Sequence, residues 1–189
     1  MASKVEICNS ALQRVGATRI TALTDGTEEA VSCNTIYDII ADEVMSSGAF
    51  SSTVRRVALA QTATTPVYEF TYEYQLPVDP KCLKVLSIDG ATPSSIPYAV
   101  EGDKLLTDET TVNIKYVTRL SSTESYGPYL TKAIISRLAS ELAYRFAGTQ
   151  SLKDSLMAQY QLDLATALAE DSLQGVSDPM YIGTLIEDR

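Results

Sequence analysis

Residues 129–146 (YLTKAIISRLASELAYRF) constrain the fold of this chain more than any other segment. Their apolar side chains recur at helical spacing, with Leu130, Ile134, Leu138 and Leu142 stepping by four. A period of 3.6 residues with one broad apolar face predicts an amphipathic helix. At roughly 25 cal/mol per Å² of buried apolar area, side chains of this size and number represent about 8 kcal/mol of gross driving force. The helix therefore needs partners, and we expect other helices of the chain to supply them.

Two helices are predicted before this one. Ser3 and Glu6 have the spacing of a capping box, which predicts a first helix that ends at Gly16. A second helix is predicted to begin near Thr27, where two glutamates favour the positive end of the helix dipole. Its apolar stripe is predicted to consist of Val31, Ile36, Tyr37, Ile40 and Val44.

One more helix is predicted after the central one. Pro128 and Gly148 mark the two ends of the central helix, and Ser151 is predicted to cap the helix that follows. Together the helices predict a four-helix bundle, with two helices from each end of the chain. Its core is predicted to include Leu12, Ile36, Ile40, Leu138, Leu142, Leu156 and Leu164.

The middle of the chain has a different periodicity. Tyr68, Phe70, Tyr72 and Tyr74 alternate with polar residues, which predicts a half-buried strand along one side of a sheet. Further strands are predicted at 82–88, 98–100, 105–107 and 112–116, giving four or five short antiparallel strands. The turns between them are predicted at Asp89 and Gly90, and at Glu101, Gly102, Asp103 and Lys104.

These elements predict an α+β fold in three parts. Residues 1–52 and 119–173 form the helical domain, residues 53–118 form an inserted β-sheet or barrel domain, and residues 174–189 form an extended tail. The tail is apolar enough to dock on a partner, although packing back on its own helices explains it equally well. Its apolar residues are Met180, Tyr181, Ile182, Leu185 and Ile186.

Charge and hydropathy limit the partners. The net charge is −9, from 24 acidic and 15 basic residues, which disfavours gripping nucleic acid and suits a surface that DNA passes without sticking. No apolar run has the length of a membrane span, and the N-terminus lacks a signal peptide's apolar core. We therefore expect a protein made in the cytoplasm, with no membrane partner.

Residue chemistry offers no catalytic, cofactor-binding or metal-binding site. The chain has no histidine, and Cys8, Cys33 and Cys82 are widely spaced, so they are interpreted as buried or neutral thiols. The adjacent acids Asp42-Glu43 and Asp108-Glu109 point apart and are interpreted as solvated. The tyrosine alternation is interpreted as sheet core or an interface rather than as a stacking platform for carbohydrate or bases. The basic residues Arg55, Arg56, Lys81 and Lys84 are interpreted as surface salt-bridge partners.

A series of short motifs along nearly the whole chain goes further than this chemistry. In chain order they are Asn9-Ser10-Ala11-Leu12, Arg14-Val15-Gly16-Ala17, Ile20-Thr21-Ala22-Leu23, Asp25, Glu29-Ala30, Cys33-Asn34, Tyr37-Asp38, Leu76-Pro77, Asp79, residues 83–86, Val100-Glu101-Gly102, Leu105-Leu106, residues 112–117, Tyr126, Pro128, Leu138-Ala139, Leu142-Ala143 and Gly148. In these motifs the chain resembles phage tail tubular protein A, the head-to-tail adaptor of T7-like short-tailed phages. Ala49-Phe50-Ser51-Ser52 stands where this family has an aromatic-rich segment.

The resemblance implies a virion protein of the tail or neck, made in the cytoplasm of a host bacterium. It implies a dodecameric ring of identical subunits, bound to the portal protein above and to a nozzle protein like tail tubular protein B below. Double-stranded DNA would pass through the ring without specific binding. The helices and the tail would face the portal. The β loops containing Asp89, Gly90, Glu101, Gly102 and Asp103 would face the nozzle.

Two functions of other classes remain alternatives. A carboxylate-dependent glycan hydrolase would need two carboxylates about 5 Å or 6.5–9.5 Å apart, one with a raised pKa. A protein-binding assembly chaperone would bind one partner through its helices and form no ring.

Overall fold

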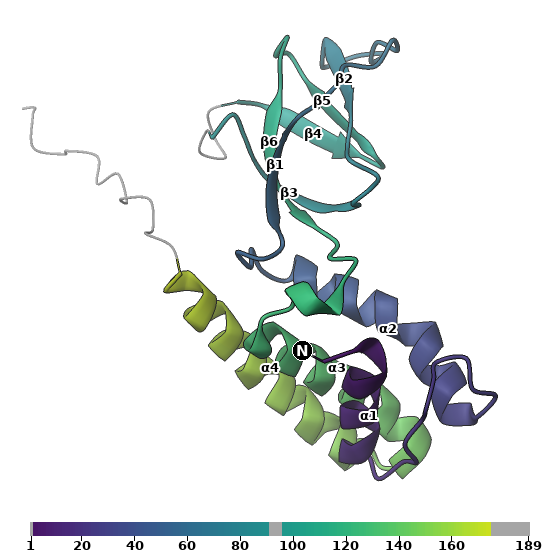
Figure 1. Ribbon diagram of the computed structural model, residues 1–189. Helices are drawn as coiled ribbons and strands as arrows, with labels where there is room; N and C mark the ends of the chain where they lie inside the picture. Colours follow the sequence, from purple (N-terminus) through teal and green to yellow (C-terminus); the bar gives the residue numbers. More distant parts are fainter. Residues whose placement is uncertain (1, 91–95, 175–189) are drawn as a thin grey trace, which may run out of the picture.

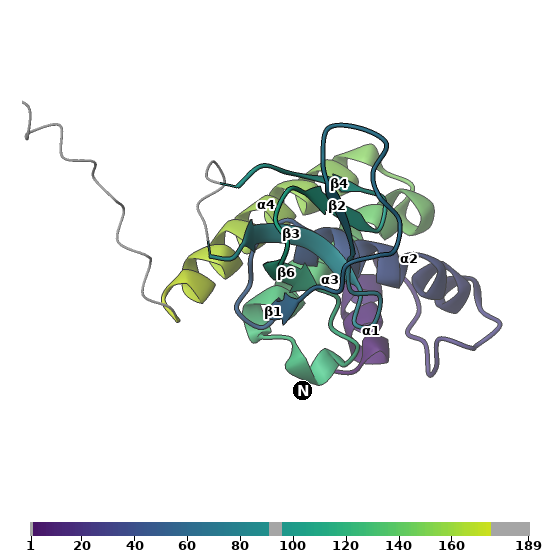
Figure 2. The same cartoon turned by 90° about the horizontal axis from the view of Figure 1, so that it is seen from above.

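Helices and strands occupy opposite ends of the molecule; the strands come from one continuous segment, and the helices come from the segments before and after it. The computed structural model describes residues 2–90 and 96–174 as a mixed α+β structure with four helices and two small antiparallel sheets. Figure 1 shows the sheets at one end and the helices at the other. Seen from above, the strands lie over the helices (Figure 2).

The four helices begin and end at recognisable signals. They are α1 (Lys4–Arg14), α2 (Glu28–Ser46), α3 (Pro128–Ala147) and α4 (Gln150–Ser172). Ser3 and Glu6 form both hydrogen bonds of a capping box, Pro128 stands in the first turn of α3, and Gly148 ends it with φ 66°. None of the helices in the described ranges combines the length and apolarity that a membrane span needs.

Helix α3 is the element that the other three helices contact, whereas α4 packs chiefly on α3. Leu12, Ile40, Leu138 and Leu142 are buried in the shared core, as a long apolar stripe on α3 requires. The remaining predicted core residues, Ile36, Leu156 and Leu164, lie half-buried at its margin.

Two details of the helices differ from the prediction. Val31 is 56% exposed, because it lies on the side of α2 that faces away from α3. Ser151 does not cap α4; the residue before the helix is Thr149, and Ser151 lies inside the first turn. Gly148 closes α3 so tightly that α4 starts two residues later, before the serine is reached.

The strands form two sheets that share one core. In the first, β1 (Val54–Ala58), β6 (Asn113–Thr118) and β3 (Cys82–Ile88) are ordered β1-β6-β3. In the second, β2 (Tyr72–Gln75), β5 (Lys104–Thr107) and β4 (Tyr98–Glu101) are ordered β2-β5-β4. The chain after β1 crosses from one sheet to the other, since Gln61 bridges to Tyr74. The buried core between the sheets contains Tyr74, Leu76, Ile88, Leu105, Val112, Ile114 and Tyr116.

The prediction for the tyrosine-rich segment is wrong in its first half. Strand β2 begins only at Tyr72, and Tyr68 is 80% exposed in a loop. Glu69 has φ 74°, a left-handed conformation that interrupts an extended strand. The described residues also form six strands rather than four or five, because β1 was not predicted.

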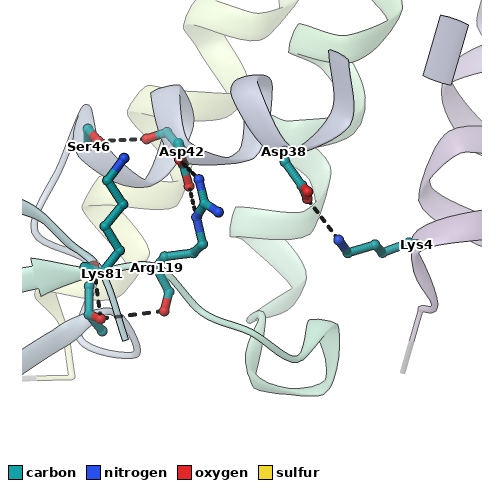
Figure 3. A network of polar contacts seen from close by, with 7 residues as sticks. Lys4, Asp38, Asp42, Ser46, Lys81 and Arg119 are labelled. Atoms are coloured by element: carbon teal, nitrogen blue, oxygen red, sulfur yellow. Dashed lines mark hydrogen bonds and ion pairs between the residues drawn. The ribbon is translucent and has the colours of Figure 1, made fainter. Parts of the chain in front are cut away.

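A polar junction connects the sheets to the helices (Figure 3). Arg119, just after β6, forms a two-bonded ion pair with Asp42 of α2. Its Nε donates to Oδ1 at 2.7 Å, and a terminal guanidinium nitrogen donates to Oδ2. The Arg119 N–H donates to the Lys81 carbonyl at 3.0 Å, which joins the same residue to β3. Lys4 pairs with Asp38 at 2.8 Å and so ties α1 to α2. Hydrogen bonding to Asp42 raises the pKa of Arg119, so this junction stays charged.

Candidate assembly surfaces

The β1-β6-β3 sheet is basic in an acidic protein. Its three strands carry Arg55, Arg56, Lys84 and Lys115, and within these strands there is no aspartate or glutamate. The register places Arg56 opposite Lys115, and Lys115 opposite Ser87. Ile114 and Tyr116 point into the core, so Arg56, Lys115 and Ser87 lie on the outer face.

This outer face is hollowed. A depression of about 350 Å³ is lined by Arg56, Ser87, Asp89, Gly90, Asn113, Ile114 and Lys115. Asp89 already accepts hydrogen bonds from the backbone and side-chain nitrogens of Asn113, at 3.1 and 2.6 Å. The arginine and lysine are therefore the groups with unused capacity for an anionic partner.

The basic residues of this sheet do not form the predicted salt bridges. Across residues 2–90 and 96–174, none of Arg55, Arg56, Lys81, Lys84 and Lys115 lies in an ion pair. The guanidinium of Arg55 instead donates to the backbone carbonyls of Ser52 and Val54. The sequence already shows that these three strands contain no acidic residue. This fact indicates a basic surface only when the strands are known to lie side by side in one sheet.

The outer face of the β2-β5-β4 sheet carries two glutamates, Glu73 and Glu101, and one lysine, Lys104, which the register places opposite Glu101. Glu73 and Glu101 line a second depression of about 260 Å³, together with Leu106 and the loop 64–70. Glu73 is held in place, since Thr62 donates to it at 2.9 Å and Lys104 lies 3.5 Å away. Glu101 is exposed.

The loop 64–70 projects two large apolar side chains into water. Val67 is 97% exposed and Tyr68 is 80% exposed. The backbone N–H of Phe70 donates to the Tyr68 carbonyl at 2.9 Å, and with φ 74° at Glu69 this is a γ-turn of the rare, strained kind. A strained turn that exposes apolar side chains is typical of a binding loop.

The predicted nozzle-facing residues belong to two separate turns. Asp89 and Gly90 follow β3, whereas Gly102 and Asp103 join β4 to β5. Asp103 accepts a hydrogen bond from Gln75 at 3.0 Å, which lowers the pKa of its carboxyl group. The two turns belong to different sheets and share no hydrogen bond among the described residues. The predicted docking residues Met180, Tyr181, Ile182, Leu185 and Ile186 lie outside the described residues.

The carboxyl groups of the described residues whose pKa is shifted do not have the raised value of a general acid. Four carboxyl groups have a clearly shifted pKa, and in Glu6, Asp25, Asp103 and Asp163 alike the shift is downward, whereas a general acid needs a raised value. Cys8 and Cys33 are buried, and contact with Cys33 together with burial raises the pKa of the Cys8 thiol. Within the described ranges, no three potential ligands among His, Cys, Asp and Glu gather as a metal site.

A buried carboxylate joins α3 and α4, and no sequence pattern predicted its role. Asp163 of α4 is 4% exposed and lies 3.0 Å from the Lys132 ammonium, which is on α3. Gln159 donates to it at 2.9 Å, and Ser136 donates to its other oxygen. Arg14 of α1 donates to the same Ser136 hydroxyl at 2.6 Å, so the network spans three helices.

Comparisons with known proteins do not identify a family. No protein-family model matches the chain, and no curated protein matches it significantly.

Proposed function

We propose that this protein is a structural component of a phage virion, a ring-forming adaptor between the portal and the tail nozzle. In this proposal it acts without catalysis or cofactor. Subunits related by rotation contact each other through two different patches, which is the contact type that closes a ring. The double-stranded DNA passes through the opening without sequence-specific binding.

The observation that carries this proposal is the position of the residues that resemble tail tubular protein A. Several of them hold the helical framework in place, whereas Glu101 and residues 113–115 line the two depressions. Asn9 accepts from the Ile20 N–H at 2.8 Å and donates to the Ile20 carbonyl at 2.9 Å. Gly16 ends α1 with φ 70°, and Asp25 accepts from the N–H groups of Thr21 and Ala22. Residues with such structural duties support a shared fold, not an incidental match of composition.

The same proposal assigns the two ends of the molecule to two partners. The helices, as a bundle of four, and the tail 174–189 face the portal, and the sheets face the nozzle. Exposed apolar side chains support a protein partner for the helices: Ile39 on α2 is 66% exposed and Leu162 on α4 is 65% exposed.

Negative-stain microscopy of the purified protein, alone and mixed with portal rings of the same virus, tests the proposal. The expected result is a ring, or an added layer under the portal. Deletion of residues 176–189 is expected to leave a folded protein that no longer joins the portal, whereas the full-length wild type serves as the comparison and joins it. A protein that ignores the portal and forms no ring would refute the adaptor function and favour the single-partner chaperone.

A further inference from the structure

The two sheets present opposite charges on opposite sides of one small structure. Sheets packed face to face on a shared core have outer faces that point away from each other. One outer face carries Arg56 and Lys115, and the other carries Glu101, with Glu69 in the loop above it. Each of these faces is hollowed, by about 350 and about 260 Å³ respectively.

We propose that these faces bind each other between neighbouring copies of this chain. The loop 64–70 and the acidic face of β2-β5-β4 on one copy dock in the basic depression of β1-β6-β3 on the next. This inference rests on the proposed ring and identifies one of its subunit contacts. Because the two patches differ, the contact is head-to-tail and leaves a free acidic face for each further copy.

The like charges on the basic face indicate that it binds a partner that carries the opposite charge. Arg56 and Lys115 are direct cross-strand partners on the same face, a placement that destabilises an isolated sheet. Six of the fourteen Lys and Arg residues of the described chain lie in ion pairs with carboxylates, and Arg56 and Lys115 are among the eight that do not. Carboxylates of a second copy, here Glu69 and Glu101, would remove the repulsion.

The loop supplies what charge alone does not. Val67 and Tyr68 are the most exposed large apolar side chains among the described residues. An aromatic ring placed over a guanidinium is attracted to it, so Tyr68 against Arg56 joins burial with a cation–π contact. The γ-turn at Glu69 fixes the loop tip before binding, which reduces the ordering cost of docking.

Nucleic acid is the other polyanion that a basic face suits, and it fits less well. A protein of net charge −9 repels a duplex at long range. Two cations and a small depression also make few phosphate contacts. The chain itself, in contrast, carries a complementary acidic face with apolar side chains at its edge.

A charge-exchange experiment tests the contact. Arg56→Glu with Lys115→Glu reverses the basic face, and Glu69→Lys with Glu101→Lys reverses the acidic face. Ring assembly on portal rings is counted by negative-stain microscopy for each double variant and for the two combined. We expect each double variant to lose rings and the combined variant, whose net charge equals that of the wild type, to recover them. Arg19→Glu with Lys153→Glu makes the same net change away from both faces and is expected to keep rings.

The outcomes separate the contact from the function. Rings from both double variants, or no recovery in the combined variant, would overturn the contact and leave the adaptor function standing. Absence of rings from the wild type would overturn both. Duplex binding at low salt is measured by fluorescence anisotropy. If the variant Arg56→Glu with Lys115→Glu keeps its rings but loses duplex binding, the basic face binds nucleic acid instead.

A single variant checks that loss of rings is not loss of folding. Arg56→Glu replaces a like-charge pair by an ion pair with Lys115, so the melting temperature of the free protein is expected to rise by about 1–3 °C. The same variant is expected to assemble fewer rings. A lower melting temperature would contradict the repulsion argument.

Discussion

The buried carboxylate of Asp163 gives the sharpest test of how the helices are held together. It is 4% exposed on α4. It accepts hydrogen bonds from Ser136 of α3 and from Gln159 of its own helix, and it forms an ion pair with Lys132 of α3. Replacing it by alanine removes a charged acceptor from a site where Ser136 is fully buried. We expect Asp163→Ala to loosen α4 from α3, the helix on which it chiefly packs.

The size of the effect follows from the exposure of each partner. A hydrogen bond to a charged group contributes about 1.5–3 kcal/mol. The Lys132 side chain is 55% exposed, and Gln159 is also exposed, so both regain water when the carboxylate is removed. Only the Ser136 contact is then lost in full, and we expect about 2 kcal/mol. For a chain of this length that corresponds to a fall in melting temperature of about 4–8 °C.

The pH dependence has a definite sign. Burial raises the pKa of Asp163, but the hydrogen bonds from Ser136, Lys132 and Gln159 outweigh it, and the pKa is lowered. A carboxyl whose pKa is lower in the folded state stabilises the fold above its unfolded pKa of about 3.9. That contribution is lost as pH falls through the folded value. The difference in stability between wild type and Asp163→Asn should therefore be constant from about pH 5 to 7 and shrink below about pH 4.

Thermal and urea unfolding followed by circular dichroism measure both effects. Asp154→Ala is the control, since Asp154 lies on the same helix, is exposed, and is bonded only to Gln150 among the described residues. It is expected to change stability by less than about 0.5 kcal/mol. Equal loss from Asp154→Ala and Asp163→Ala, or a difference that does not change with pH, would refute the reasoning.

Three further substitutions test other parts of the structure. Leu138→Ala is expected to cost about 2–5 kcal/mol in urea unfolding because Leu138 is fully buried, whereas Leu162→Ala on the exposed side of α4 should be nearly neutral. Asn9→Ala removes both bonds to Ile20 and should cost about 1–3 kcal/mol, with faster hydrogen exchange at the Ile20 amide; an unchanged rate would contradict it. Asp42→Asn weakens a partly exposed pair with Arg119 and should cost at most about 1 kcal/mol, an effect that fades at high salt.

The start of α1 and both ends of α3 were predictable because their signals are local. Ser3 and Glu6 meet within one turn, and Pro128 and Gly148 act through their own backbone geometry. Strand β3 and the β4-β5 hairpin were predicted for the same reason, since turn residues border them. Such features do not depend on what the rest of the chain does.

Features that depend on distant neighbours were not predictable in this way. Strand β1 has no alternating pattern, since its last four residues are exposed, and its pairing with β6 defines it. The tyrosine alternation predicted a longer strand than exists, because the γ-turn at Glu69 is set by the loop and not by periodicity. Asp163 occupies a buried position of α4 together with Tyr160 and Ala167, and only the arrival of Lys132 from α3 shows why a carboxylate can be buried there.

Ion pairs connect the helices to one another, whereas no described residue of β1, β3 or β6 lies in an ion pair. Among the described residues, pairs cross between α1 and α2, between α2 and α3, and between α3 and α4, so the helices neutralise one another's charges. The cations of β1, β3 and β6 have no such partners there. Stability alone would favour an acidic residue opposite Lys115, yet an arginine stands in that position. The β1-β6-β3 sheet thus retains the repulsion between Arg56 and Lys115, whereas the helices have ion pairs between them. A retained repulsion of this kind is expected on a surface that binds another molecule.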